Sequence, residues 1–138
     1  MIEKHEIVLK TKAGTDVIDI TPQVNEILVK SKVKSGIACI FVTGSTASIS
    51  TLEYEPNLVK DVKKALERIA PENEEYEHHK TWGDDNGSSH VRACLMKPGI
   101  CVPFEDRKLS LGTWQQIVLL DFDTRDRERR IIVQIIGE

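Results

Sequence analysis

The stretch LSLGTWQQIVLLDFDTRDRERRIIVQII, residues 109–136, decides the fold class of this chain. It holds two apolar runs rich in Ile, Val and Leu, with the charged connector TRDRER between them. Each run is short enough to be a strand. Two such runs joined by a short polar loop are typical of a β-hairpin. We therefore expect residues 109–123 and 130–136 to pair as a C-terminal β-hairpin.

Two earlier segments have the pattern of amphipathic helices. TPQVNEILVKSKV (21–33) offers Thr21 as an N-cap and Pro22 at the first helical position. NLVKDVKKALERIA (57–70) places Val and Leu residues on one helical face. A shorter segment, HVRACLM (90–96), is compatible with a short helix that begins at Ser88 or Ser89.

The remaining apolar runs predict strands. They are rich in β-branched residues and lie at residues 5–10, 16–20, 36–43, 48–54 and 100–105. Strands therefore dominate, and they do not alternate regularly with helices. This order favours a single α+β domain over residues 1–138, in which two main helices pack on one side of a mostly antiparallel or mixed sheet.

Composition excludes several functional classes. The net charge of −3 argues against a protein that coats nucleic acid. No apolar run is long enough to cross a membrane, and the first residues lack the apolar core of a signal peptide, so we expect a cytoplasmic protein. The three cysteines have no CxxC spacing, which favours neither a disulfide framework nor a zinc ribbon.

The segment HHKTWGDDNGSSHVR, residues 78–92, gathers three of the four histidines of the chain with two aspartates. Imidazole nitrogens and carboxylate oxygens together suit a divalent cation such as zinc, manganese or magnesium. We expect His78, Asp85 and His90 to be the ligands, with Asp85 and His90 also acting in catalysis and Asn86 orienting a ligand. The adjacent His79 and Asp84 are expected to point away. The alternative is a solvated polar loop whose histidines cap helices.

The segment TGSTAS, residues 43–48, follows an apolar strand and carries a glycine and several hydroxyls. Glycine lets backbone amides approach an anion, and Ser45 and Thr46 can donate to phosphate oxygens. A plain turn is the alternative. Glu53 and Glu55 follow closely, either as exposed charges at the end of a strand or as an extra carboxylate for the cation site.

A third polar patch lies in LGTWQQI, residues 111–117. Trp114 is expected in the core, so that Thr113 and Gln115 are available to a substrate or a neighbouring subunit. Arg92 is expected to clamp a phosphate together with Ser45 and Thr46, because its fork matches phosphate oxygens. The alternative for Arg92 is a surface ion pair. The RDRERR segment balances its own charges, and we interpret it as a solvated loop.

These patches together resemble one known family. The segments GSTASISTLEYEP, YEHH, DDNGSSHVRA, LGTWQQIVLLDFD and RRIIVQIIGE are similar to the YjbQ-like proteins, and the resemblance runs over nearly the whole chain. It implies an α+β fold and a homotrimer with a metal- or anion-bearing pocket close to the subunit contacts. One departure is Gly44, where many members of the family have a histidine. Its absence places more weight on His78 and His90.

The resemblance implies the activity of a secondary thiamine-phosphate synthase, which joins a pyrimidine pyrophosphate to a thiazole phosphate and releases pyrophosphate. The sequence thus favours a small metal-assisted enzyme that acts on a phosphorylated metabolite. One alternative is a non-catalytic trimer that binds a metal or an anionic metabolite. Another is a structural oligomer with a vestigial site.

Overall fold

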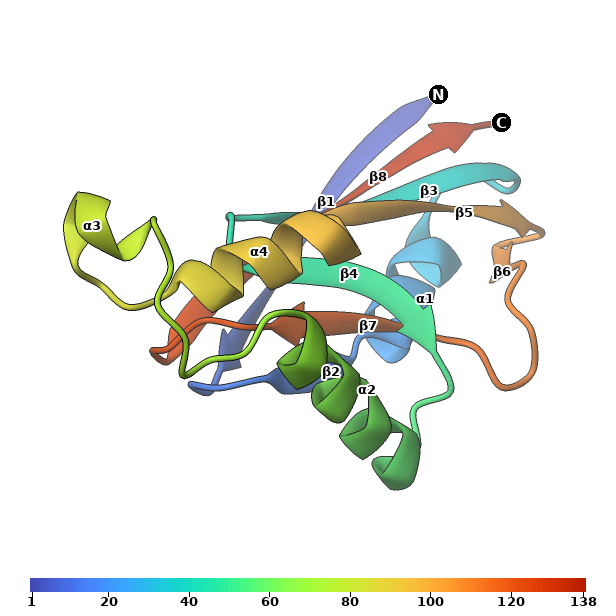
Figure 1. Ribbon diagram of the computed structural model, residues 1–138. Helices are drawn as coiled ribbons and strands as arrows, with labels where there is room; N and C mark the ends of the chain where they lie inside the picture. The colour runs from blue at the N-terminus through green and yellow to red at the C-terminus, as the bar shows by residue number, and fades with distance from the viewer.

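The computed structural model describes residues 1–138 as two antiparallel sheets with helices around them (Figure 1). The five-stranded sheet has the order β1 (Ile2–Thr11), β8 (Arg127–Gly137), β3 (Gly36–Thr43), β5 (Gly99–Glu105) and β6 (Lys108–Leu109). The three-stranded sheet has the order β2 (Asp16–Asp19), β7 (Gln116–Asp121) and β4 (Ala47–Leu52). The helices are α1 (Thr21–Lys30), α2 (Pro56–Ile69), α3 (His79–Trp82) and α4 (Gly87–Met96). The predicted α+β class is confirmed.

The predicted C-terminal hairpin is wrong. Strand β7 pairs with β2 and β4, whereas β8 pairs with β1 and β3, so the two strands belong to different sheets. The chain crosses between the sheets just after β7, where the Phe122 amide donates to the Thr46 carbonyl. The burial patterns of β7 and β8 explain why they lie in different sheets. Residues 117–121 are buried without alternation, as in a strand covered on both faces, while β8 alternates between buried and less buried positions.

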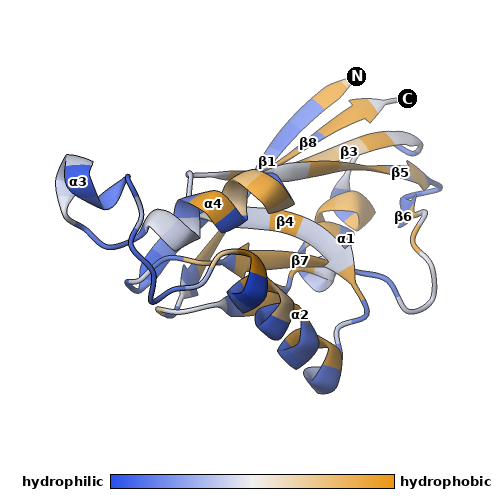
Figure 2. Ribbon diagram, viewed as in Figure 1, coloured by the Kyte–Doolittle hydropathy of each residue, from blue (hydrophilic) through white to orange (hydrophobic).

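The core lies in two layers. Between the sheets, Ile40, Ile49, Leu119 and Val133 belong to a fully buried cluster, to which α1 contributes Val24. The other face of the three-stranded sheet is covered by α2, whose apolar side faces the strands (Figure 2), and by α4, which contributes Ala93 to the buried cluster. The predicted single sheet with helices on one side is therefore replaced by two sheets, of which only the smaller carries α2 and α4.

The start of α1 differs by one residue from the prediction. Ile20, not Thr21, occupies the N-cap position, and no side chain caps the helix. The Thr21 hydroxyl instead accepts from the Ile117 amide at 2.8 Å, which fixes the start of α1 against β7. Pro22 lies in the first turn as expected.

Glu55 is neither a free strand-end charge nor a cation ligand in this fold. Its carboxylate accepts from the amides of Asn57 and Leu58 at 2.6 and 2.8 Å and so caps α2. We expect Glu55→Ala to lower the free energy of unfolding by about 1–2 kcal/mol, because two amides lose their acceptor. Urea unfolding measures this loss. The matched control is the exposed Glu53→Ala, for which we expect a change within about 0.5 kcal/mol; equal losses would reject the cap.

Candidate functional site at the corner of the two sheets

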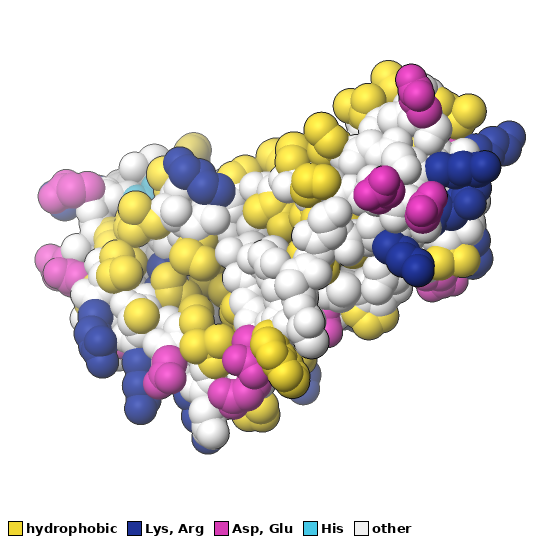
Figure 3. Space-filling view, turned by 90° about the vertical axis from the view of Figure 1, so that its right-hand side faces the viewer, with side chains coloured by type: hydrophobic (Ala, Val, Ile, Leu, Met, Phe, Trp, Pro, Cys, Tyr) yellow, Lys and Arg dark blue, Asp and Glu magenta, His cyan; other side chains and the backbone are white.

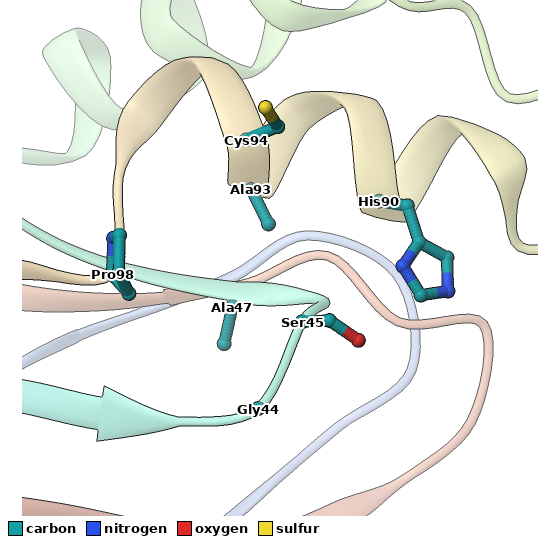
Figure 4. Close-up of a pocket in the computed structure, with 7 residues that line it drawn as sticks. All are labelled: Gly44, Ser45, Ala47, His90, Ala93, Cys94 and Pro98. Atoms are coloured by element: carbon teal, nitrogen blue, oxygen red, sulfur yellow. The ribbon is translucent and has the colours of Figure 1, made fainter.

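A hollow lies where the chain passes between the sheets and meets the start of α4. One part, about 400 Å³, is lined by Gly44, Ser45, Ala47, His90, Ala93, Cys94 and Pro98 (Figure 4). The adjoining part shares Gly44, Ser45 and His90 with the first. Its other lining residues are Thr46, His78, Trp82, Asp84, Asn86, Arg127 and Arg129. We call the two parts together the corner pocket.

Two of the predicted site residues meet in this pocket. The imidazole rings of His78, just before α3, and His90, in the first turns of α4, lie with their centroids 4.5 Å apart. His78 Nε2 and Asn86 Oδ1 are buried, and neither has a hydrogen-bond partner. An unpartnered buried polar atom costs free energy, so such atoms beside a pocket are typical of a ligand site.

The environment of His90 favours its neutral form. Burial lowers the pKa of His90 below its usual value of 6.5, and the nearby His78 lowers it further. Asp123 and Asp84 act in the opposite direction without reversing the shift. A neutral imidazole keeps a nitrogen lone pair, which is the form that binds a metal ion or accepts a proton.

The predicted ligand set of His78, Asp85 and His90 is not assembled. The Asp85 carboxylate lies 3.5 Å from Nδ1 of His79 and its side chain is 88% exposed. No group of three or more His, Cys, Asp and Glu side chains is arranged to hold a metal ion. His78 and His90 are the two imidazoles that lie together here, and Nε2 of His78 is buried without a partner.

Asp84, rather than Asp85, lines the pocket. The prediction assumed that neighbouring residues point to opposite sides, which holds for an extended chain. Here Gly83 and Asp85 both have left-handed backbone angles, with φ of +71° and +53°. The loop therefore turns twice within three residues, and alternation does not apply.

The two hydroxyls of the TGSTAS segment have different roles. Ser45 is exposed and lines both parts of the pocket. Thr46 is buried, and its hydroxyl donates to Asp123 at 3.0 Å and accepts from Arg129 at 2.6 Å. Thr46 is thus held by the protein, and only Ser45 remains free to contact a phosphate.

Arg92 does not converge with Ser45 and Thr46, so that prediction is wrong. Its side chain is 2% exposed and donates to the Ala70 carbonyl, Thr15 and Glu67 at 2.7–2.9 Å. It therefore anchors α4 to the end of α2. Residues two apart on a helix lie on different sides, so Arg92 cannot face the same pocket as His90.

Arg127 and Arg129 take the place expected for Arg92. Side chains alternate along β8, so both arginines lie on the same face of the strand as the buried Ile131. The prediction that RDRERR is a solvated loop is therefore wrong for residues 127–130, which belong to β8. Arg129 binds Asp121 through two nitrogens at 2.6 and 2.8 Å, and Arg127 Nε binds Asp123 at 2.7 Å. The sequence does contain a signal for this placement. Arg127 and Arg129 are two residues apart and continue the alternation of the apolar residues Ile131 and Val133, which indicates that the strand begins before Ile131.

The Asp123 carboxylate of this corner stays charged. Burial alone would raise the pKa of Asp123, but hydrogen bonds from Arg127, Thr46 and the Thr124 amide hold it below its usual value. Gly44 lies against the same network, because a Cβ at this position would meet Arg129 Nη1 at 2.8 Å. The space beside residue 44 is thus filled by an arginine in this chain.

The third predicted patch lies elsewhere. Thr113 and Gln115 line a separate hollow with Arg107 and Lys108, and Gln115 Nε2 donates to Thr51. Trp114 is 72% exposed rather than in the core, since residues 113–114 form a turn before β7 begins. This loop and α3 lie at opposite ends of the molecule (Figure 1).

Comparison with known proteins identifies the family of this chain. A family model described as "UPF0047 protein YjbQ-like" matches residues 5–138. The chain belongs to the YjbQ-like family. The YjbQ-like relatives include a UPF0047 protein of Archaeoglobus fulgidus, 36% identical over 95% of this chain and 99% of the relative. Another, from Methanothermobacter thermautotrophicus, is 35% identical over 97% of this chain and 92% of the relative.

Solved structures of other proteins share the fold of this YjbQ-like chain. A YbjQ-like protein of unknown function from Sulfolobus solfataricus superposes with a TM-score of 0.88 at 32% identity, and each chain is fully covered. A hypothetical protein from Aeropyrum pernix has a TM-score of 0.91 at 27% identity, with 99% of both chains covered. In this YjbQ-like chain no helix has the length and apolar character needed to cross a membrane.

Proposed function

We propose that the corner pocket binds a divalent cation together with a phosphorylated small molecule, and that the protein is an enzyme acting on that molecule. The observation that carries this proposal is the unpartnered Nε2 of His78, buried beside the His90 ring in a pocket that also contains Ser45 and Arg127. Imidazole nitrogens, a hydroxyl and a guanidinium thus line one space, which supports the proposal.

His78 and His90 would hold the cation. Imidazole nitrogen suits zinc or manganese better than magnesium, which prefers oxygen ligands. When bound, the cation would supply positive charge that neutralises phosphate oxygens as a leaving group departs. Because the chain provides only two such ligands here, phosphate oxygens and water are expected to complete the coordination.

Ser45 and Arg127 would hold the phosphate. The Ser45 hydroxyl is exposed in the pocket. Arg127 bonds Asp123 through Nε, and its side chain is 37% exposed, so its terminal nitrogens can donate to an anion. Hydrogen bonds from a charged donor contribute about 1.5–3 kcal/mol each. Arg129 contributes charge, although its hydrogen bonds go to Asp121 and Thr46.

The concrete reaction to test is thiamine-phosphate synthesis, with its pyrophosphate leaving group. Wild-type protein should release pyrophosphate from the two phosphorylated substrates in the presence of manganese or zinc. We expect His90→Ala to lower the rate at least a hundredfold, and Asp85→Asn, which lies outside the pocket, to retain it. A wider screen of phosphorylated metabolites for phosphate release extends the same assay.

A non-catalytic binding module is the second candidate, and a specific observation favours it. Arg129 donates to both Asp121 and Thr46, and these hydrogen bonds leave few free groups for catalysis. Tight binding of pyrophosphate or a phosphorylated metabolite without turnover would support this candidate. Absence of both binding and turnover would contradict both.

We expect the protein to be a trimer in solution. Large apolar side chains are exposed on several elements, including Val29 of α1, Trp114, and Ile37 and Ile136 of the five-stranded sheet. Figure 3 shows such side chains over the end of the molecule that holds β5 and β6. Association would remove this apolar surface from water. Light scattering at micromolar concentration measures the mass; a monomer would contradict the prediction.

A further inference from the structure

Two cysteines lie opposite each other on neighbouring strands. Cys39 of β3 and Cys101 of β5 are direct partners in the antiparallel register. Cys39 is half-buried and Cys101 is exposed. Neither belongs to the buried core clusters, so core packing does not explain why two thiols face each other here.

The ladder geometry brings these side chains close. The Val42 amide donates to the Pro98 carbonyl at 2.9 Å, so Val42 and Pro98 form a hydrogen-bonded pair. Hydrogen-bonded and non-hydrogen-bonded pairs alternate along an antiparallel ladder. Three positions along the ladder, Cys39 and Cys101 are therefore a non-hydrogen-bonded pair, in which Cα atoms are about 4.5 Å apart. This separation lies inside the range of about 4.4–6.8 Å that a disulfide spans.

We propose that Cys39 and Cys101 form a reversible cross-strand disulfide, and that the pair is a thiol–disulfide redox site of this protein. The disulfide would join the two strands that flank the corner pocket. Strand β3 leads into the Gly44–Thr46 loop, and β5 follows α4 and Pro98. Oxidation would thus cross-link the two strands whose ends lead to Gly44 and Pro98 in the lining of the pocket.

The oxidant is a small disulfide such as oxidised glutathione. The thiolate of the exposed Cys101 attacks one sulfur of the reagent, forms a mixed disulfide and releases one glutathione thiolate. Cys39 then loses its proton and attacks the Cys101 sulfur, which forms the Cys39–Cys101 bond and releases the second glutathione. Two protein thiols are oxidised, the reagent disulfide is reduced to two thiols, and the two protons end on them.

The order of the two attacks follows from the environment. Burial, followed by the neighbouring Cys101 thiol, raises the pKa of Cys39, so less of it is thiolate at neutral pH. Cys101 is exposed and is the first nucleophile, and Cys39 resolves the mixed disulfide. Cys94, exposed on α4, has no cysteine opposite it in a ladder and provides the control.

The test treats wild-type protein with oxidised glutathione, then titrates thiols after denaturation and maps the peptides by mass spectrometry. We expect the thiol count to fall from three by at least two, with a Cys39–Cys101 linked peptide and no glutathione adduct at either of these cysteines; an adduct on the exposed Cys94 does not affect this result. Cys94→Ser should retain the link, and Cys39→Ser should instead keep glutathione on Cys101. Three remaining thiols, adducts in place of the link, or a link through Cys94 would overturn the proposal.

The melting temperature of the oxidised protein tests whether the disulfide forms without distorting β3 and β5. The bond closes a long loop between β3 and β5, which restricts the unfolded chain. We expect the melting temperature of the oxidised protein to rise by about 5–15 °C, and to return on reduction. A lower melting temperature after oxidation would show that the native register does not accommodate the bond and would also overturn the proposal.

Discussion

Replacing Arg129 by methionine is expected to lower the free energy of unfolding by about 3–5 kcal/mol. Arg129 and Asp121 are both buried and joined by two hydrogen bonds of 2.6 and 2.8 Å. Methionine keeps most of the side-chain volume but removes the charge. Asp121 would then keep only the donors of Thr11 and the Asp123 amide against its buried negative charge.

Three further variants make this prediction specific: Arg130→Met, Asp121→Leu alone, and a double variant. Arg130 is the neighbouring arginine, and its exposed contact with Glu6 is 3.5 Å long. We expect Arg130→Met to change stability by less than about 1 kcal/mol. The double variant Asp121→Leu with Arg129→Met should lose less than the sum of the two single variants, because no unpaired charge remains. Urea unfolding of all four variants measures this; additive losses would reject a coupled pair.

Loss of either pocket imidazole is expected to remove cation binding. We expect His78→Ala and His90→Ala each to weaken zinc or manganese affinity by more than about a hundredfold, since even residues that only support a metal ligand contribute 10–100-fold. Asp85→Asn should bind as wild type does, because Asp85 lies beside His79 and outside the pocket. Equilibrium dialysis measures the affinities. Equal binding by the two histidine variants and wild type would reject the site.

The pH dependence of this binding has a defined direction. The pKa of His90 in the folded protein is lowered from 6.5. Above 6.5 the ring is neutral whether the protein is folded or unfolded, and it stays neutral in the fold somewhat below that pH. Cation affinity should therefore persist as pH falls to 6.5 and be lost at lower pH, as the ring protonates. The stability of the metal-free protein should fall over the same window, because unfolded His90 takes up a proton first.

Local patterns predicted the elements that depend on local physics. The apolar face of α2 and the short apolar run of β3 were both identified correctly, because helix and strand periodicity need no knowledge of distant partners. The partners of β7 and β8 were predicted wrongly, because any two antiparallel strands can form backbone hydrogen bonds with each other. The choice between partners is made by burial of β7 on both faces, which only the assembled layers determine.

In the candidate site, His78 and His90 lie together as the sequence predicted, whereas Asp85 and Arg92 do not line the corner pocket. Asp85 was misplaced because two left-handed residues reverse the loop. Arg92 was misplaced because it lies two positions from His90 on a helix, on a different side. Arg127 and Arg129 were missed because their strand begins earlier than the apolar residues that mark it.

The most direct measurement is calorimetric titration of pyrophosphate into wild-type protein, with and without manganese, at pH 7.5. If the corner pocket holds a cation and a phosphorylated ligand together, wild-type and Asp85→Asn proteins bind pyrophosphate, and manganese strengthens the binding. The double variant His78→Ala with His90→Ala then shows no strengthening by manganese. Wild-type protein that binds no pyrophosphate in either condition, or a double variant that responds to manganese as wild type does, would contradict the proposed site.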